Sequence, residues 1–263
     1  MSGRTISRRG LLRAGAAAGA GATLAGCDVF DPLLRRGTAS RGFLEGANGL
    51  TYRVQRWLIG GHAMAREFDE ADIRQPMRPN GITEPDDADY GALASGGFAD
   101  WRLEVSGLVD RPLSLSLGDL RAMPSRTQIT RHDCVEGWSC IAKWTGVPLA
   151  HVLDMAGARS DARFVVFRCL DTIERGLAGE IKYYESIDMV DARHAQTILA
   201  YGMNGEDLPV ANGAPLRLRV ERQLGYKMAK YVHAIELTDD LAGFGEGGGG
   251  YWEDRGYEWY AGI

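Results

Sequence analysis

Residues 131–139 read Arg-His-Asp-Cys-Val-Glu-Gly-Trp-Ser and contain the cysteine on which the interpretation of the chain depends. The other cysteines are Cys27, Cys140 and Cys169. If Cys27 is set aside because it lies at the end of an N-terminal targeting segment, three thiols are left. At most one disulfide can then form, so at least one thiol needs another role. Cys134 is therefore a candidate metal ligand, reactive nucleophile or inert buried thiol.

Two later stretches accompany the cysteine segment. Residues 212–217 read Asn-Gly-Ala-Pro-Leu-Arg, and residues 224–230 read Leu-Gly-Tyr-Lys-Met-Ala-Lys. Taken alone, Asn212-Gly213 is an ordinary turn dipeptide. The three stretches are informative because they occur together and in this order.

In order and approximate spacing, these stretches resemble the cysteine segment and the two pterin-binding stretches of sulfite-oxidase-type molybdopterin oxidoreductases. They most closely resemble the periplasmic methionine-sulfoxide reductase catalytic subunits, and the likeness extends from about Asn80 to the C-terminus. The resemblance implies an α+β fold, with a sulfite-oxidase-type molybdopterin-binding domain that has a mixed β-rich core and short helices. It also implies an oxidoreductase whose cofactors are molybdenum and molybdopterin.

The resemblance assigns the metal to Cys134. In this family molybdenum takes two sulfurs from the pterin dithiolene and one from a cysteine, and a soft thiolate suits a metal that changes oxidation state. The neighbouring Arg131 and His132 are expected to lower the pKa of the Cys134 thiol and keep it deprotonated.

The resemblance also assigns the contacts to the pterin, a planar heterocycle with amide-like edges and a phosphate. Gly213 and Gly225 permit close approach of the backbone, and the cationic side chains are expected to meet the phosphate. Cys169 stands where the relatives have Thr, which puts one hydrogen bond to the cofactor in question. The implied cofactor contacts are Asn80, Cys169, Asn212, Arg217, Met228, Ala229 and Lys230.

Glu136 and Tyr257 occupy places that, in those relatives, face the molybdenum from the substrate side. A carboxylate at this place would repel a small dianion such as sulfite. We therefore expect an oxygen-atom-transfer enzyme that reduces a neutral S-oxide or N-oxide, with a sulfite-oxidising enzyme of the same family as the alternative.

The pattern of apolar residues predicts strands separated by short helices, without a regular βαβ repeat, and this favours an α+β domain. The region 76–97 is expected to be an extended loop. Residues 216–221 alternate as in a strand, so the alternative to a cofactor contact at Arg217 is that its side chain lies on the solvated face of this strand. Lys230 has the same alternative. The other predicted strands are at 101–106, 163–170 and 231–237, and the predicted helices begin at Ser116 and Pro148.

The N-terminus resembles an export signal followed by a lipidation site. Residues 7–13 read Ser-Arg-Arg-Gly-Leu-Leu-Arg, as in twin-arginine signals, and residues 24–27 read Leu-Ala-Gly-Cys, as in a bacterial lipobox. We expect lipid anchoring through Cys27 at the periplasmic face of the inner membrane or at the cell surface. The expected organisation is a signal at 1–27, a linker and N-terminal segment at 28–75, and the catalytic domain at 76–263, with residues 28–48 as the linker proper.

The charge balance is acidic. The whole chain carries 30 basic and 35 acidic residues. Cleavage before Cys27 would leave 26 basic residues and a net charge of −9. This excludes nucleic acid as an expected partner and disfavours electrostatic adhesion to anionic lipid.

Electrons are expected to come from a separate redox partner, a membrane haem protein in the reductase relatives, because the sequence has no C-x-x-C-H haem motif. A monomer that acts on a small-molecule substrate is expected. The aromatic C-terminus has two interpretations, a segment attached to the core or a segment folded over the cofactor site. Three other hypotheses are a cysteine hydrolase using His132 and Cys134, a zinc protein using Cys134, Cys140 and Cys169, and a lipoprotein binding module.

Overall fold

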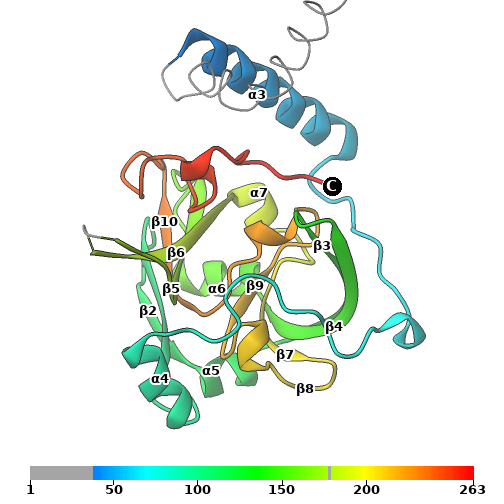
Figure 1. The fold of residues 1–263 in the computed structure, drawn as a ribbon, viewed down its shortest axis with the longest axis vertical. Helices are drawn as coiled ribbons and strands as arrows, with labels where there is room; N and C mark the ends of the chain where they lie inside the picture. Colours follow the sequence, from blue (N-terminus) through cyan, green and yellow to red (C-terminus); the bar gives the residue numbers. More distant parts are fainter. Residues whose placement is uncertain (1–37, 177–178) are drawn as a thin grey trace, which may run out of the picture. The chain divides into compact units, whose positions relative to one another are not determined.

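The computed structural model describes residues 38–176 and 179–263 (Figure 1). The chain divides into two compact units, residues 1–54 and 55–263. The twin-arginine motif and Cys27 lie outside the described residues. The second unit begins at Gln55, and the start of the catalytic domain at residue 76 stays a prediction.

One sheet has five strands in the order β2-β1-β10-β5-β6. β1 and β10 run parallel, and every other neighbouring pair in this order is antiparallel. The predicted strands at 101–106, 163–170 and 231–237 are confirmed. The bounds are β1 Arg102–Gly107, β2 Leu113–Ser116, β5 Phe164–Gly176, β6 Gly179–Asp188 and β10 Val232–Thr238.

The second sheet has the path β3-β4-β7-β8, and β9 also pairs with β7. All of its pairings are antiparallel, and the register between β4 and β7 shifts between Thr145 and Gly146. The β3–β4 hairpin carries the cysteine segment at its turn. The bounds are β3 Arg126–Cys134, β4 Trp138–Pro148, β7 Ile198–Met203, β8 Glu206–Asp207 and β9 Arg217–Arg219.

The main hydrophobic core joins the two sheets through helix α6. Leu103 and Phe167 from the first sheet, Leu199 from the second, and Val152 from α6 are all completely buried in one apolar cluster. A second cluster on the β3-β4-β7 sheet contains Trp144. The β4–β7 region is therefore enclosed on both faces, which fixes β4 and, through its pairing with β3, the hairpin turn that carries Cys134.

The predicted helices at Ser116 and Pro148 are confirmed. Ser116 accepts a hydrogen bond from the Asp119 amide and forms a capping box, and Gly157 ends α6 with a left-handed φ of 66°. The α-helices are α3 Ala39–Ile59, α4 Ala88–Ser95, α5 Leu117–Ala122, α6 Leu149–Ala156 and α7 Met189–Ala192, and the 3₁₀ helices are η1 Glu70–Asp72, η2 Val210–Asn212, η3 Gly225–Lys227 and η4 Glu253–Arg255.

Two loop predictions were wrong. The expected extended loop at 76–97 contains α4, which begins because Asp87 caps it by accepting from the Tyr90 amide. The expected linker at 28–48 is helical from Ala39 onward. Its glycines obscured a helical spacing of apolar residues. No helix in the described ranges is long and apolar enough to cross a membrane.

The alternative in which Arg217 lies on a solvated face of the strand at 216–221 was wrong. Regular strand geometry is limited to β9, and Arg217 and Arg219 are completely buried along with Leu218. The guanidinium carbons of the two arginines lie 4.9 and 4.3 Å from the centre of the Trp144 ring. An alternating pattern predicts which side chains share a face, but it does not predict whether polar ones meet water.

Gly146→Ala should destabilise the second unit by about 2 kcal/mol or more, because a Cβ at this position would overlap the backbone of Leu199 and Ala200 on β7. Urea unfolding measures the change. Gly91→Ala in α4 is the matched control, since no atom lies within 4 Å of the added Cβ and helix propensity predicts a gain of up to about 1 kcal/mol. Equal unfolding midpoints for the two variants would contradict this account of the β4–β7 contact.

Candidate functional site

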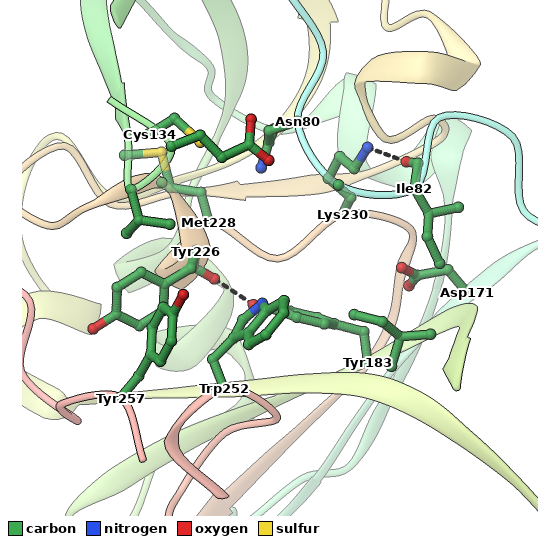
Figure 2. Close-up of a pocket in the computed structure, with 15 residues that line it drawn as sticks. Asn80, Ile82, Cys134, Asp171, Tyr183, Tyr226, Met228, Lys230, Trp252 and Tyr257 are labelled. Carbon is green, nitrogen blue, oxygen red and sulfur yellow. Dashed lines mark hydrogen bonds between the residues drawn. The ribbon is translucent and has the colours of Figure 1, made fainter. Parts of the chain in front are cut away.

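The candidate site is a pocket assembled from segments far apart in the sequence (Figure 2). Its empty space is about 740 Å³, part of it open to solvent, which is within the range of small-molecule and cofactor pockets. Most of the wall is apolar or aromatic. The lining residues are Asn80, Gly81, Ile82, Cys134, Val135, Glu136, Asp171, Ile173, Tyr183, Gly225, Tyr226, Met228, Lys230, Trp252 and Tyr257.

Cys134 is the last residue of β3 and lies at the turn of the β3–β4 hairpin. It is in register with Trp138, and the Gly137 amide donates to the Cys134 carbonyl at 3.1 Å. Gly137 has a φ of 83°, which a residue with a Cβ rarely adopts. The tight turn holds the thiol in a partly buried position at the pocket wall, as expected of a metal ligand that remains accessible.

The expected effect of Arg131 and His132 on the thiol was wrong, because burial raises the pKa of Cys134. Arg131 instead forms an ion pair with Asp133. The pKa of His132 is itself lowered, first by burial and then by repulsion from nearby arginines. In the protein without cofactor, Cys134 is therefore a thiol, and a metal ligated by Cys134, as predicted, would have to displace its proton.

His132 contacts the buried polar layer. Its Nδ1 lies 3.0 Å from Arg219 Nη1 and 3.3 Å from Met228 Sδ. Because a guanidinium only donates, Nδ1 accepts and the imidazole proton resides on Nε2. This arrangement differs from a Cys–His nucleophile pair, in which the imidazole would accept from the thiol.

The stretches at 212–217 and 224–230 contribute cationic side chains to a buried layer beside the pocket. Arg217 donates to the Asn212 carbonyl at 2.9 Å, and Lys230 donates to the carbonyls of Ile82 and Ala211. Burial and neighbouring cations lower the pKa of Arg217 to about 9 and that of Lys230 to about 7. Gly213 has no side chain at a point where a Cβ would lie 2.9 Å from the Lys230 Cβ.

Several buried polar atoms in this region have no hydrogen-bond partner among the described residues. They include Asn80 Oδ1, Asn212 Nδ2, Arg217 Nε and Asp171 Oδ1. A buried polar atom left without a partner costs about 1–3 kcal/mol, so native structures rarely retain several together. Donors, acceptors and cations of this kind fit a ligand with amide-like edges and a phosphate, and the residues present therefore fit molybdopterin.

Of the residues predicted from the sequence, Asn80, Cys134, Glu136, Met228, Lys230 and Tyr257 line the pocket, and Figure 2 shows five of them by name. Asn212, Arg217 and Ala229 belong to the adjoining buried layer, and their roles as cofactor contacts stay predictions.

The other two thiols in the described part of the chain lie in apolar surroundings. Cys169 is completely buried on β5, opposite Val232 of β10, and belongs to the main core. Cys140 is buried in the other apolar cluster. The hypothesis of a zinc site built from Cys134, Cys140 and Cys169 was therefore wrong, because these thiols do not converge. Among the described residues no group of three or more His, Cys, Asp and Glu side chains is placed to hold a metal ion.

Glu136 lines the pocket next to Cys134, as expected, but it is also held by neighbours. Its carboxylate accepts from Trp138 Nε1 at 2.9 Å and lies 3.9 Å from Arg78 Nη2. The side chain is 57% exposed, so its field at the pocket is screened. Arg78 is the cation that offsets its charge.

The aromatic C-terminus serves both of the roles considered. Tyr251 belongs to the main core, whereas Trp252 and Tyr257 line the pocket. Trp252 and Tyr257 stack at 5.2 Å, and Tyr257 meets Tyr226 edge-on at 5.3 Å. The segment is thus attached to the core and forms one wall of the site (Figure 2).

Sequence reasoning missed Asp171, Tyr183 and Trp252. Tyr183 donates to the Tyr226 carbonyl at 2.5 Å and so fixes the pocket wall behind Met228. Asp171 is a buried acid two residues from Cys169 on the same strand, and a charged residue within an apolar run was the available signal. Trp252 was noted only as one of several C-terminal aromatics.

Comparison with known proteins identifies the class. The model of the family "Oxidoreductase molybdopterin binding domain" matches residues 91–243. The putative protein-methionine-sulfoxide reductase subunit YedZ1 of Azospira oryzae is 37% identical over 256 residues, which are 97% of this chain and 88% of that protein. The protein-methionine-sulfoxide reductase catalytic subunit MsrP of Campylobacter jejuni is 35% identical over 148 residues, 54% of this chain and 50% of that protein. The solved sulfane dehydrogenase SoxCD from Paracoccus pantotrophus matches with a TM-score of 0.48 and 24% identity, over 54% of this chain and 39% of that one.

The chain therefore belongs to the family of oxidoreductases with a molybdopterin-binding domain. Its fold is the sulfite-oxidase-type α+β domain, and it is a molybdopterin-dependent enzyme whose cofactor is molybdenum–molybdopterin. Asn80, Trp252 and Tyr257 lie outside the residues matched by the family model.

Asp171→Asn should stabilise the cofactor-free protein near pH 7. Burial raises the pKa of Asp171 from 3.8 to about 6, so the folded state binds this proton more tightly than the unfolded state does. Wild type then loses up to about 3 kcal/mol of stability as pH rises from about 4 to about 6, whereas Asn does not titrate.

Urea unfolding at several pH values measures this difference, which should be small near pH 4 and largest above pH 6. Asp239→Asn, at an exposed position, is the control and should follow wild type throughout. A constant offset between wild type and Asp171→Asn at all pH values would show that Asp171 ionises normally in the folded protein.

Proposed function

We propose that this chain is the exported, membrane-tethered catalytic subunit of a reductase that removes the oxygen atom from a neutral S-oxide or N-oxide. Methionine sulfoxide is the favoured substrate class, because two relatives carry that activity in their names. The overall reaction consumes two electrons and two protons and releases water. The alternative, a sulfite-oxidising enzyme of the same family, runs an oxygen transfer in the opposite direction.

One observation carries the proposal. The pocket brings the Cys134 thiol and the Glu136 carboxylate together with the aromatic wall of Trp252 and Tyr257. An apolar, aromatic wall packs against alkyl groups and excludes water, as a neutral thioether or S-oxide requires. A dianion would instead need several cations at the pocket, and the one near Glu136 is already engaged by that carboxylate.

Different residues of the chain would hold the metal, the pterin and the substrate. Cys134 would hold the metal, and Asn212 and Arg217 would hold the pterin and its phosphate through the polar atoms left unpartnered. Lys230 would add a positive charge beside the phosphate. Molybdopterin-bound molybdenum supplies two-electron oxygen-atom transfer when it is present. Tyr257 would donate a hydrogen bond from its hydroxyl to the substrate oxygen and position it.

The electrons would come from a separate subunit, a membrane haem protein paired with a monomeric catalytic chain. The Azospira relative is named as a subunit, which supports the proposal of a partner protein. Export through the twin-arginine route and lipid attachment at Cys27 rest on the sequence motifs alone. The two together would hold the enzyme at the periplasmic face of the inner membrane or at the cell surface.

Cys134→Ser should abolish reductase activity while leaving the fold and most of the bound pterin, because only one metal ligand is weakened. Reduction of methionine sulfoxide with an artificial electron donor, molybdenum content and the fluorescence of released, oxidised pterin provide the three measurements. Cys140→Ser is the matched control, since Cys140 is buried in a cluster away from the pocket. It should cost stability and keep the metal. Activity of Cys134→Ser within a few-fold of wild type would remove Cys134 from the mechanism.

Glu136→Gln should increase any sulfite oxidation by up to about tenfold and change sulfoxide reduction much less, because the lost charge acts only on an anion and is screened by exposure. Steady-state assays with sulfite and with a neutral sulfoxide measure the two rates. Arg78→Gln removes the opposing charge and should shift sulfite oxidation in the other direction. Efficient sulfite turnover without sulfoxide reduction by wild type would refute the proposed direction.

A further inference from the structure

Helix α3, Ala39–Ile59, has an exposed stripe of apolar side chains. The exposed fractions of Phe43 and Trp57 are 78% and 81%, so both aromatic side chains are largely open to solvent. Successive members of the stripe are four, three, four, three and one residues apart, so they share one face of the helix. The α3 stripe consists of Phe43, Ala47, Leu50, Val54, Trp57 and Leu58.

The opposite side of the last turns of α3 belongs to the catalytic unit. Gln55 and Arg56 are partly buried, and Arg56 forms ion pairs with Asp188 and Asp191 at 2.8 and 2.7 Å. At 100° per residue, Arg56 points about 140° away from Phe43. The α3 stripe therefore lies on the side of the helix that points away from Arg56.

We propose that α3 lies in the surface of a lipid bilayer with the α3 stripe buried among the lipids. This inference rests on the proposed function, because lipidation of Cys27 would bring the helix to the membrane. Residues 28–38 join Cys27 to α3, and eleven residues reach at most about 40 Å. The anchor thus restricts α3 to the immediate neighbourhood of the bilayer, where an amphipathic helix is stable in the interface.

Sequence features of α3 favour lipid over a second copy of the helix. The α3 stripe extends over only about two heptads, whereas stable coiled coils need three or more. Gly42, Gly46 and Gly49 each weaken the helix by about 1 kcal/mol relative to Ala. A helix of this composition requires an external surface to remain folded, and an interface that binds one exposed apolar face provides it.

The charge pattern predicts how α3 binds. The mature chain is strongly acidic, which opposes electrostatic adhesion to anionic lipid. The sequence of α3 contains one acid, Glu45, and the exposed Arg53 falls at the edge of the α3 stripe. Burial of apolar side chains would therefore supply the binding energy, so binding should change little with salt concentration.

Cosedimentation with vesicles tests the proposal without the lipid anchor. The chain beginning at residue 28, which contains every residue that the structure describes, is loaded with cofactor and mixed with phosphatidylethanolamine–phosphatidylglycerol vesicles. It should bind reversibly, in low and high salt alike. The triple variant Phe43→Ser, Leu50→Ser, Trp57→Ser should bind at least about tenfold more weakly, with unchanged sulfoxide reduction in solution.

Ile181→Ser with Ile263→Ser removes exposed apolar side chains elsewhere and should leave vesicle binding unchanged. Equal binding by the triple variant and wild type would overturn the proposal, as would binding that high salt abolishes. Sedimentation-velocity dimers that the triple variant loses, in a chain that ignores vesicles, would assign the α3 stripe to a second copy instead. The mass of the N-terminal peptide from exported protein tests lipidation of Cys27 independently.

Discussion

A buried guanidinium is the constraint on which the site depends. Arg217 is completely inaccessible to solvent, and its hydrogen-bond partners in the described part of the chain are the carbonyls of Asn212 and Met228. Its neighbour Arg219 is neutralised by a bidentate ion pair with Glu221. An isolated buried cation is costly unless an anion compensates it. The lowered pKa of Arg217 reflects that cost, and a phosphate at the adjoining unpartnered atoms would offset it.

This requirement explains much of the local architecture. Trp144 on β4 gives both guanidinium groups an aromatic face, which helps β9 to bury cations. Arg219 in turn fixes His132, so the imidazole is neutral and takes no part in activating the neighbouring thiol. A metal bound at Cys134, as proposed, would itself have to lower the pKa of this thiol. The polar layer therefore determines the protonation states of the site before any cofactor arrives.

The sequence predicted the elements whose signals are local. Pro148, Gly157 and the apolar spacing between them define α6, and the run at Phe164 defines β5, because capping and periodicity act over a few residues. The order of the motifs also predicted the residues near Cys134. Burial of Arg217 and convergence of Asp171 with Lys230 depend on strand pairing over long separations, which no local pattern contains. The helix at Ala39 was missed because glycines lowered its apparent propensity.

The C-terminal wall depends on a second buried charge cluster. Lys227 Nζ donates to Glu185 and Glu253, both at 2.5 Å, and all three side chains are almost completely inaccessible. Burial and the neighbouring Glu253 carboxylate raise the pKa of Glu185 well above its ordinary value, so one lysine suffices for two acids. Lys227 lies between Tyr226 and Met228, which line the pocket, while Glu253 follows Trp252 directly. Removing one member of a buried ion cluster leaves the others unpaired. The cluster therefore couples the position of the aromatic tail to the stretch at 224–230, and the tail is an integral part of the pocket.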